Sequence, residues 1–475
     1  MKDNVIDQIQ QLVKALEAGN YNAAPSSLVQ GAALQVEDLT PVMQNVTYDD
    51  SHIKLQKMLK VESSKSTLVQ FDRQLSYGIF GGSAQLEGNV GQEETSDFIR
   101  AVVPMAYYSE VRRATIVANM VATVDGKKAD ERGAADAAKR IAGDIEFDLF
   151  RGLGDFSNGG IFDGNPAALP VPAVNIHGLE LQVRQSDAQR NTRDLMFAEY
   201  GSDDTVVIPG GTALTQGMVE DASVRSALNF GTADRLVIDP KVLSQYNKIV
   251  FGKERIVLAG SPQDATAADL RKQWVSGGTV NIEASRFLSG KTQPAPTRPR
   301  SPAAPTLTSA TSTTTAGVVT PFVSGQVYRY YVTSGNEVGE SPKSAEVSET
   351  VAATGDEIVL VITHPGSTVV RWFNVYRTKT NGATGTEKFI GRVKISDGAT
   401  TDFHDFGNKV PGFVTGYLIQ GDTMSVKELA PYSRMKLAVT DLSQPEAHFR
   451  FLTLAVFQPR KNVLIDNLDP SLASP

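Results

Sequence analysis

Residues 125–152 read DGKKADERGAADAAKRIAGDIEFDLFRG, and the fold predicted for the chain depends on this stretch. Apolar side chains recur in it every three or four positions, which places them on one face of a helix. Charged side chains occupy the opposite face, and Gly152 follows where such a helix is expected to end. We therefore predict a long helix with one buried side. The buried side is expected to hold Ala134, Ala138, Ile141, Ile145 and Leu149, and the charged side Asp136, Lys139, Arg140 and Asp144.

The chain before this helix is predicted to be extended. Residues 66–75 (STLVQFDRQL) alternate in character, and residues 97–123 are rich in β-branched and aromatic side chains. Five glycines lie between these two strand-like segments, in residues 77–96. A glycine-rich segment is a poor core former, so this segment is predicted to form, with the strands on either side, a two-stranded projection that needs an external surface.

The first 50 residues leave two interpretations open. Residues 4–17 place Ile6, Ile9, Val13 and Leu16 on one stripe, which predicts a short amphipathic helix. Residues 18–50 are rich in Ala, Asn and Ser and have weak periodicity. Such a segment is either an ordered arm that lies on another subunit or a flexible tail.

The chain after residue 186 alternates between helical and strand patterns. Residues 187–200 are predicted to be helical, and residues 205–211 (TVVIPGG) predict a short buried strand. Helices at 212–228 and 242–250 and a strand at 254–260 follow. This alternation indicates an α/β domain. The inward side chains of the helix at 212–228 are expected to be Leu214, Met218, Ala222 and Val224.

The composition changes sharply at residue 291. Residues 291–321 contain closely spaced prolines and then a Thr/Ser-rich run, which predicts an extended linker. Residues 322–416 contain short strands separated by turn residues and predict a β sandwich. Residues 417–475 return to mixed character, with one strong strand predicted at 448–465.

Composition excludes several kinds of chemistry. The chain of 475 residues has no cysteine, so disulfides, thiolate zinc sites and a cysteine nucleophile are excluded. The formal net charge is −7 and no basic block is present, so we expect no dedicated nucleic-acid tail. No basic region followed by an apolar run begins the chain, so no signal peptide is expected. No apolar run is long enough to cross a membrane, and no membrane partner is expected.

No pattern predicts a catalytic, cofactor-binding or metal-binding residue. None of the five histidines has a metal-ligand spacing, and no GxSxG elbow is present. Asp402 and His404 alternate onto one side of a strand, where a polar strand end is favoured over a metal or acid–base site. Trp372 and Tyr376 share a strand face, where core packing is favoured over a sugar-binding surface.

The order of these parts resembles the major capsid proteins of tailed bacteriophages, which have the Hong Kong 97-type fold. The resemblance implies an α+β chain with an inserted all-β immunoglobulin-like sandwich. Its spine helix would be residues 128–151, its extended β-hairpin loop residues 69–103 and its closing strand residues 448–465. The implied parts are an N-terminal arm (1–59), the extended loop with flanking strands (60–124), a peripheral domain with the spine helix (125–204), an axial α/β domain (205–290), the Pro-rich linker with the insertion (291–416) and a return to the core (417–475).

The resemblance implies a protein that self-assembles as pentamers and hexamers into an icosahedral head around double-stranded DNA. The implied partners are further copies of the chain, other virion proteins such as portal, scaffold or decoration proteins, and DNA bound without sequence specificity. The implied location is the virion, after assembly in the host cytoplasm. Some family members crosslink through a lysine on the extended loop, but residues 74–111 contain no lysine. A tail sheath or tube subunit and a carbohydrate-binding adhesin are the alternatives, and an enzyme is disfavoured.

Overall fold

The computed structural model describes residues 49–471, with gaps at 78–86, 121–127, 153–175, 185–206, 252–271 and 290–300 and at shorter loop positions. The predicted helices at 4–17 and 187–200, the predicted strand at 254–260 and most of the glycine-rich hairpin tip lie outside the described residues. The chain divides into two compact units. The smaller unit includes residues Arg112–Ala135 and Leu437–Pro445, and in it α3 (Ile116–Met120) begins where the Ile116 N–H donates to the Leu442 carbonyl.

The predicted spine helix is present as α4 (Ala129–Arg151). Ile141, Ile145 and Leu149 are buried as expected, whereas Ala134 and Ala138 are only half-buried. Gly152 ends the helix, and its N–H donates to the Asp148 carbonyl at 2.7 Å. A Cβ at residue 152 would lie 2.2 Å from the Ile176 carbonyl oxygen, so only glycine fits there.

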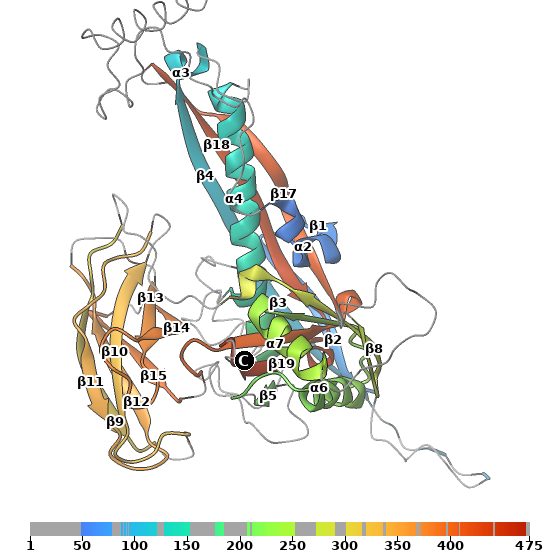
Figure 1. Ribbon diagram of the computed structural model, residues 1–475. Coiled ribbons are helices and arrows are strands. Elements are labelled where there is room, and N and C mark those ends of the chain that lie inside the picture. Colours follow the sequence, from blue (N-terminus) through green and yellow to red (C-terminus); the bar gives the residue numbers. More distant parts are fainter. Residues whose placement is uncertain are drawn as a thin grey trace, which may run out of the picture. The chain divides into compact units, whose positions relative to one another are not determined.

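A four-stranded sheet lies along α4 (Figure 1). Its strands are in the order β1-β17-β18-β4, and short helix α2 (Leu55–Met58) leads into β1. Leu452, Leu454 and Val456 share one hydrophobic cluster with the buried face of α4. The strands are β1 (Lys60–Ser63), β4 (Ala106–Thr115), β17 (Met424–Lys436) and β18 (Ser443–Val456).

A six-stranded sheet forms a second layer, in the order β5-β19-β16-β6-β8-β7. One face packs against α6 (Gln216–Leu228) and α7 (Pro240–Phe251), and the other contributes to the cluster around α4. Helix α5 (Leu179–Arg184) also buries its apolar residues in the cluster around α4. The strands are β5 (Val207–Pro209), β6 (Arg235–Ile238), β7 (Lys272–Val275), β8 (Gly278–Ala284), β16 (Val414–Ile419) and β19 (Val463–Leu468).

Two sequence predictions in this region are wrong in detail. The single strand predicted at 448–465 is two strands, β18 and β19, which belong to different sheets. A short helical turn with Pro459 at its start separates them, because proline cannot donate to a strand ladder. Val224 was expected to face inward from α6, but it is exposed, and Val219 is buried instead.

The predicted projection is present as a separate two-stranded sheet of β2 (Leu68–Ser76) and β3 (Asp97–Pro104). Val69 lies opposite Val103, so the two residues that were expected to limit the ribbon pair with each other. The base of the ribbon packs on the body of the chain, because Val69 and Phe71 cluster with Met105 and Ala455. The described part of the ribbon farther from this base includes Phe98, which is exposed.

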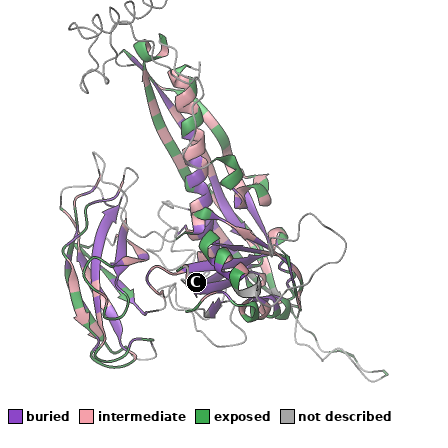
Figure 2. Cartoon of the chain, viewed as in Figure 1, coloured by how far each residue is buried: buried purple, intermediate pink, exposed green. Residues whose placement is uncertain are grey.

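A β sandwich occupies residues 306–405. A sheet in the order β11-β10-β13-β14 faces a sheet in the order β15-β12-β9 across a shared apolar core (Figure 2). The immunoglobulin-like assignment remains a prediction. The strands are β9 (Thr306–Thr313), β10 (Val327–Gly335), β11 (Val347–Thr350), β12 (Glu357–Thr363), β13 (Trp372–Arg377), β14 (Lys388–Lys394) and β15 (Thr400–Asp405).

The structure corrects both predicted limits of this sandwich. Residues 306–313 were assigned to the linker, but they form β9, which pairs with β12 and buries Leu307. Residues 414–416 were assigned to the insertion, but they begin β16 of the six-stranded sheet. Short Thr and Ser side chains at exposed strand positions gave β9 the composition of a linker.

We predict that Ile145→Asp prevents folding. Ile145 is fully buried on α4, and an unpaired charge there costs on the order of 4 kcal/mol, a large part of a domain's stability. The matched control is Ala135→Asp, which places the same charge at an exposed position of the same helix. Thermal melting of both variants provides the test, and wild-type melting of Ile145→Asp would contradict the packing of α4.

We also predict that the sandwich folds alone only when β9 is included. A fragment of residues 301–411 keeps all seven strands, whereas a fragment of residues 320–416 leaves the β9 edge of β12 unpaired. Circular dichroism and thermal melting should show a cooperative transition for the first fragment and none for the second. Equal melting of the two fragments would show that β9 is dispensable.

Candidate functional site

The polar residues singled out in the sequence lie on one strand of the sandwich. Asp402 and His404 are both exposed on β15, as the alternation predicted. His404 Nδ1 lies 2.9 Å from Oε2 of Glu357, a buried carboxylate on the neighbouring strand β12. Among the described residues, no group of three or more His, Asp or Glu side chains could hold a metal ion. These side chains therefore belong to a polar strand surface.

The aromatic pair does not form a sugar-binding surface. Tyr376 is fully buried, and its ring stacks on Tyr331 with 4.6 Å between the ring centroids. Its hydroxyl donates to Glu340 Oε1 at 2.9 Å. Trp372 is half-buried, with the Arg392 guanidinium 4.7 Å from its ring centroid. Neither side chain belongs to the sandwich core, which holds their strand neighbours Phe373 and Val375, so the predicted core packing of this pair is wrong. The burial of Tyr376 also means that the pair offers no exposed aromatic surface for the adhesin alternative.

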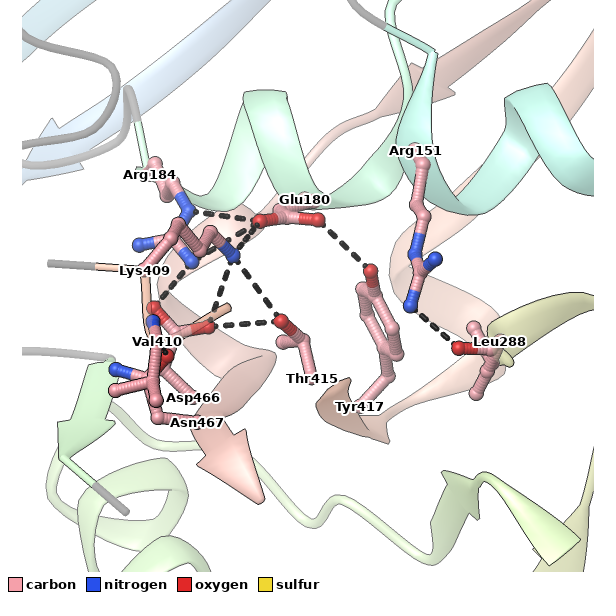
Figure 3. Close-up of polar contacts among 10 residues, drawn as sticks. All are labelled: Arg151, Glu180, Arg184, Leu288, Lys409, Val410, Thr415, Tyr417, Asp466 and Asn467. Carbon is pink, nitrogen blue, oxygen red and sulfur yellow. Dashed lines mark hydrogen bonds and ion pairs between the residues drawn. The ribbon is translucent and has the colours of Figure 1, made fainter. Parts of the chain in front are cut away.

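Sequence reasoning missed a charge cluster, which consists of Glu180, Arg184, Lys409 and Asp466 (Figure 3). Arg184 and Asp466 are buried, and Glu180 and Lys409 are half-buried. Lys409 Nζ lies 2.5 Å from Glu180 Oε1 and 3.4 Å from Asp466 Oδ1. Arg184 pairs with both acids. The two cations balance the two anions, so the cluster is neutral as a whole.

The electrostatics of the cluster keep both acids ionised. Burial would raise the pKa of Glu180, but Lys409 and Arg184 outweigh it and hold that pKa well below its usual range. Burial also opposes ionisation of Asp466, and Arg184 and Lys409 again lower its pKa. Two acids that stay ionised have no proton to exchange near neutral pH. The cluster therefore serves structure rather than acid–base catalysis.

Two further buried carboxylates lie on α4. Glu146 accepts the backbone N–H groups of residues 54, 55 and 56 at 2.9, 2.7 and 3.0 Å, which fixes the chain that leads into β1. Burial raises the pKa of Glu146, and these three N–H groups limit the rise. Asp148 accepts the Tyr108 hydroxyl at 2.7 Å. Burial raises the pKa of Asp148 to about 6, against the lowering effects of Tyr108 and Arg392.

Apolar side chains are exposed on two surfaces that the described residues do not cover. The first, the hairpin surface, includes Phe98 on β3, which is 67% exposed. The second, the sheet face, carries Tyr107, Val111 and Met435, all exposed, on β4 and β17. The Tyr107 ring packs edge-on against Phe451, with 5.0 Å between the ring centroids, which extends the sheet face onto β18. Exposed apolar side chains that lie close together mark contact surfaces between proteins.

Among the described residues, no helix is both long and apolar enough to cross a membrane.

The raised pKa of Asp148 predicts that mild acid stabilises the fold. The folded state binds this proton up to about pH 6, whereas the ordinary value is 3.8, so stability falls as pH rises between these values. The groups that act on Asp148 are Tyr108, Arg392 and Asp144. Asp148→Asn keeps an acceptor for Tyr108 without the charge. We expect the free energy of unfolding of Asp148→Asn, relative to wild type, to rise by about 3 kcal/mol between pH 4 and pH 8.

Denaturant titrations at several pH values measure this difference. Asp136→Asn is the matched control, because Asp136 is exposed on the same helix. The control should follow the wild type closely. An Asp148→Asn curve that stays parallel to wild type would mean that Asp148 is ionised in the folded protein well below pH 6.

Comparison with known proteins gives one relative in sequence. The chain is 22% identical over 472 residues to a protein of Enterococcus phage phiEF24C named "Putative major capsid protein". The match covers 97% of this chain and 95% of that protein. No family model matches the chain.

Solved capsid structures are also similar to the chain. The capsid of a native GTA particle is 10% identical, with a TM-score of 0.46 over 94% of this chain and 100% of that one. The capsid of cyanophage P-SCSP1u is 10% identical, with a TM-score of 0.43 over 95% and 100%. The capsid of Myoviridae phage XM1 is 9% identical, with a TM-score of 0.42 over 91% and 97%.

The name of the phiEF24C protein describes a structural component, and the expectation that this chain is not an enzyme agrees with it. Along nearly its whole length, the chain is thus similar to a protein named as a phage major capsid protein, as its sequence organisation indicated.

Proposed function

We propose that the chain is a capsid subunit that assembles with further copies of itself into the pentamers and hexamers of an icosahedral phage head. The observation that carries this proposal is the full-length match to a protein named as a major capsid protein. A match over 97% of one chain and 95% of the other includes the hairpin, the spine helix and the sandwich together. The role is structural and requires no catalytic group.

The uncovered surfaces support assembly with further copies. A two-stranded ribbon is marginally stable at best by itself, so β2 and β3 need a surface to lie on. The sheet face offers such a surface in another copy, because Tyr107, Val111 and Met435 are exposed on it. Closed symmetric shells repeat each contact, and every projection then meets a neighbour. We place the hairpin surface of one copy on the sheet face of the next.

The remaining parts of the proposal concern what the shell contains and where it acts. The enclosed material would be double-stranded DNA, held without sequence specificity. A chain with a net charge of −7 makes few attractive phosphate contacts, which suits a wall that confines DNA. Portal, scaffold and decoration proteins would be the other partners. The location would be the virion, after assembly in the host cytoplasm.

We predict that replacing residues 78–95 with a short turn abolishes shells but preserves the folded chain. The replaced residues include Val90, which is 93% exposed, and the base of the hairpin with its packing contacts remains. Electron microscopy shows the particles, and thermal melting reports the fold. Closed shells formed by the wild type support the proposal, whereas helical tubes would identify a tail sheath or tube subunit. Normal shells from the shortened variant would show that assembly does not need the replaced part of the hairpin.

A point substitution tests the same contact more sharply. Phe98→Asp adds a charge to the hairpin surface, where it would be buried in the assembled shell but not in the free chain. We expect wild-type melting of the free chain and a large loss of assembled particles in sedimentation. Val323→Asp, at an exposed apolar position of the sandwich, is the matched control and should assemble. Equal assembly of both variants would contradict the proposed contact.

A further inference from the structure

The segment between the sandwich and the six-stranded sheet is bound on both sides. This exit segment, residues 406–413, joins β15 to β16. On the sandwich side, the Arg377 guanidinium donates to the Lys409 carbonyl at 2.6 Å and pairs with Asp405 at 2.5 Å. Arg377 is itself buried and lies over the rings of Phe322 and Tyr328. The backbone of the exit segment is therefore attached to the sandwich core.

The side chain of Lys409 contacts the other side, which is the six-stranded sheet and helix α5. Its ammonium lies between Glu180 of α5 and Asp466 of β19, and it also donates to the Thr415 hydroxyl at 3.2 Å (Figure 3). The next residue adds a backbone contact, because the Val410 N–H donates to Asn467 Oδ1 at 2.9 Å. One residue thus contacts the sandwich through its carbonyl and the sheet layer through its ammonium.

Separation of the two parts would be costly for an electrostatic reason. Removal of Lys409 from the cluster leaves Glu180 and Asp466 with Arg184 as their cation in the cluster, so one negative charge stays uncompensated in a buried site. The Asp466 carboxylate is fully buried, so the loss of the Lys409 ammonium removes a charge partner that water does not replace at this acid. Removal of Lys409 from this site therefore costs more free energy than the breaking of an ion pair on the surface.

We propose that Lys409 locks the β sandwich to the six-stranded sheet, so that the sandwich is a fixed part of the subunit and not a freely tethered module. The proposal does not depend on the function of the assembly. In any repeated assembly, a locked sandwich would present the same surface in the same direction on every copy. A tethered sandwich would present a range of directions.

The test uses the full-length protein with Lys409→Met, which keeps the length of the side chain and removes its charge. Hydrogen exchange is followed at the Val410 amide and in the neighbouring exit segment. We expect exchange to be faster by about tenfold, the change that follows from the loss of a charge-assisted contact of about 1.4 kcal/mol. Limited proteolysis should also cleave the exit segment sooner. Lys343→Met, at an exposed lysine of the same sandwich, is the control and should leave both rates unchanged.

A second variant separates locking from general stability. Lys409→Met with Glu180→Gln restores the charge balance of the cluster, so its melting temperature should recover toward wild type. Its exit segment should still exchange fast, because the ammonium that holds it is absent. This variant also gives the measurement if Lys409→Met alone fails to fold. Wild-type exchange of the exit segment in the double variant would overturn the proposal, as would a lower melting temperature of Lys409→Met without faster exchange.

Discussion

The packing of one face of α4 joins the two sheets of the body. Ile145 and Leu149 lie in a single hydrophobic cluster with Leu452 and Leu454 of β18 and with Tyr417 of β16. Each buried aliphatic side chain of this size contributes about 1.5–3 kcal/mol through the surface it removes from water. The four-stranded and six-stranded sheets therefore depend on the same helix. A change on this face of α4 affects both sheets together.

The same helix also carries ionisable groups into the interior, and their partners differ. Glu146 accepts hydrogen bonds from three backbone N–H groups, and these bonds stabilise its charge. The three N–H groups gain an acceptor in return. Asp148 accepts one hydroxyl, from Tyr108, and its pKa rises to about 6. The number of donors around each carboxylate explains their different roles. Glu146 fixes the entry to β1, whereas protonated Asp148 is expected to add stability at mildly acidic pH that is lost as pH rises.

The sequence predicted those parts of the fold that depend on local pattern. Helical periodicity predicted a helix within residues 125–152, where α4 lies, and strand alternation predicted a strand at 66–75, where β2 lies. The capsid resemblance supplied the limits 69–103 of the ribbon, and Val69 does pair with Val103. The sequence-based predictions failed where a contact joins residues far apart in the chain, or where the composition of a strand is that of a linker. Residues 306–313 resemble a linker because Thr and Ser dominate them, yet pairing with β12 makes them a strand. The break between β18 and β19 had a visible signal in Pro459, which was not used.

The charge cluster shows why the interior sites were harder to predict. Asp466 lies in the apolar run VLIDNL and Glu180 in LELQV, and an acid within an apolar run is a signal of a buried charge. The partners of these acids could not be found in the same way, because Lys409 and Glu180 are 229 positions apart. A sequence shows which charges will be buried more readily than it shows which charges will meet.

The contacts inside the chain and the contacts left open differ in physical kind, and this difference bears on assembly. Inside, buried charges are held by ion pairs or by hydrogen bonds, as in the cluster around Asp466 and at Glu146. On the hairpin, by contrast, the base is fixed and Phe98, farther along the ribbon, is exposed. Arg73 donates to the carbonyls of residues 456 and 457 at 2.6 and 3.0 Å, and the Phe71 ring packs edge-on against Phe457. A ribbon that is anchored at its base loses less conformational freedom when its exposed part binds a surface. Modest apolar contacts can then hold subunits together when they are repeated over many copies, without being strong enough to trap two subunits in a wrong arrangement.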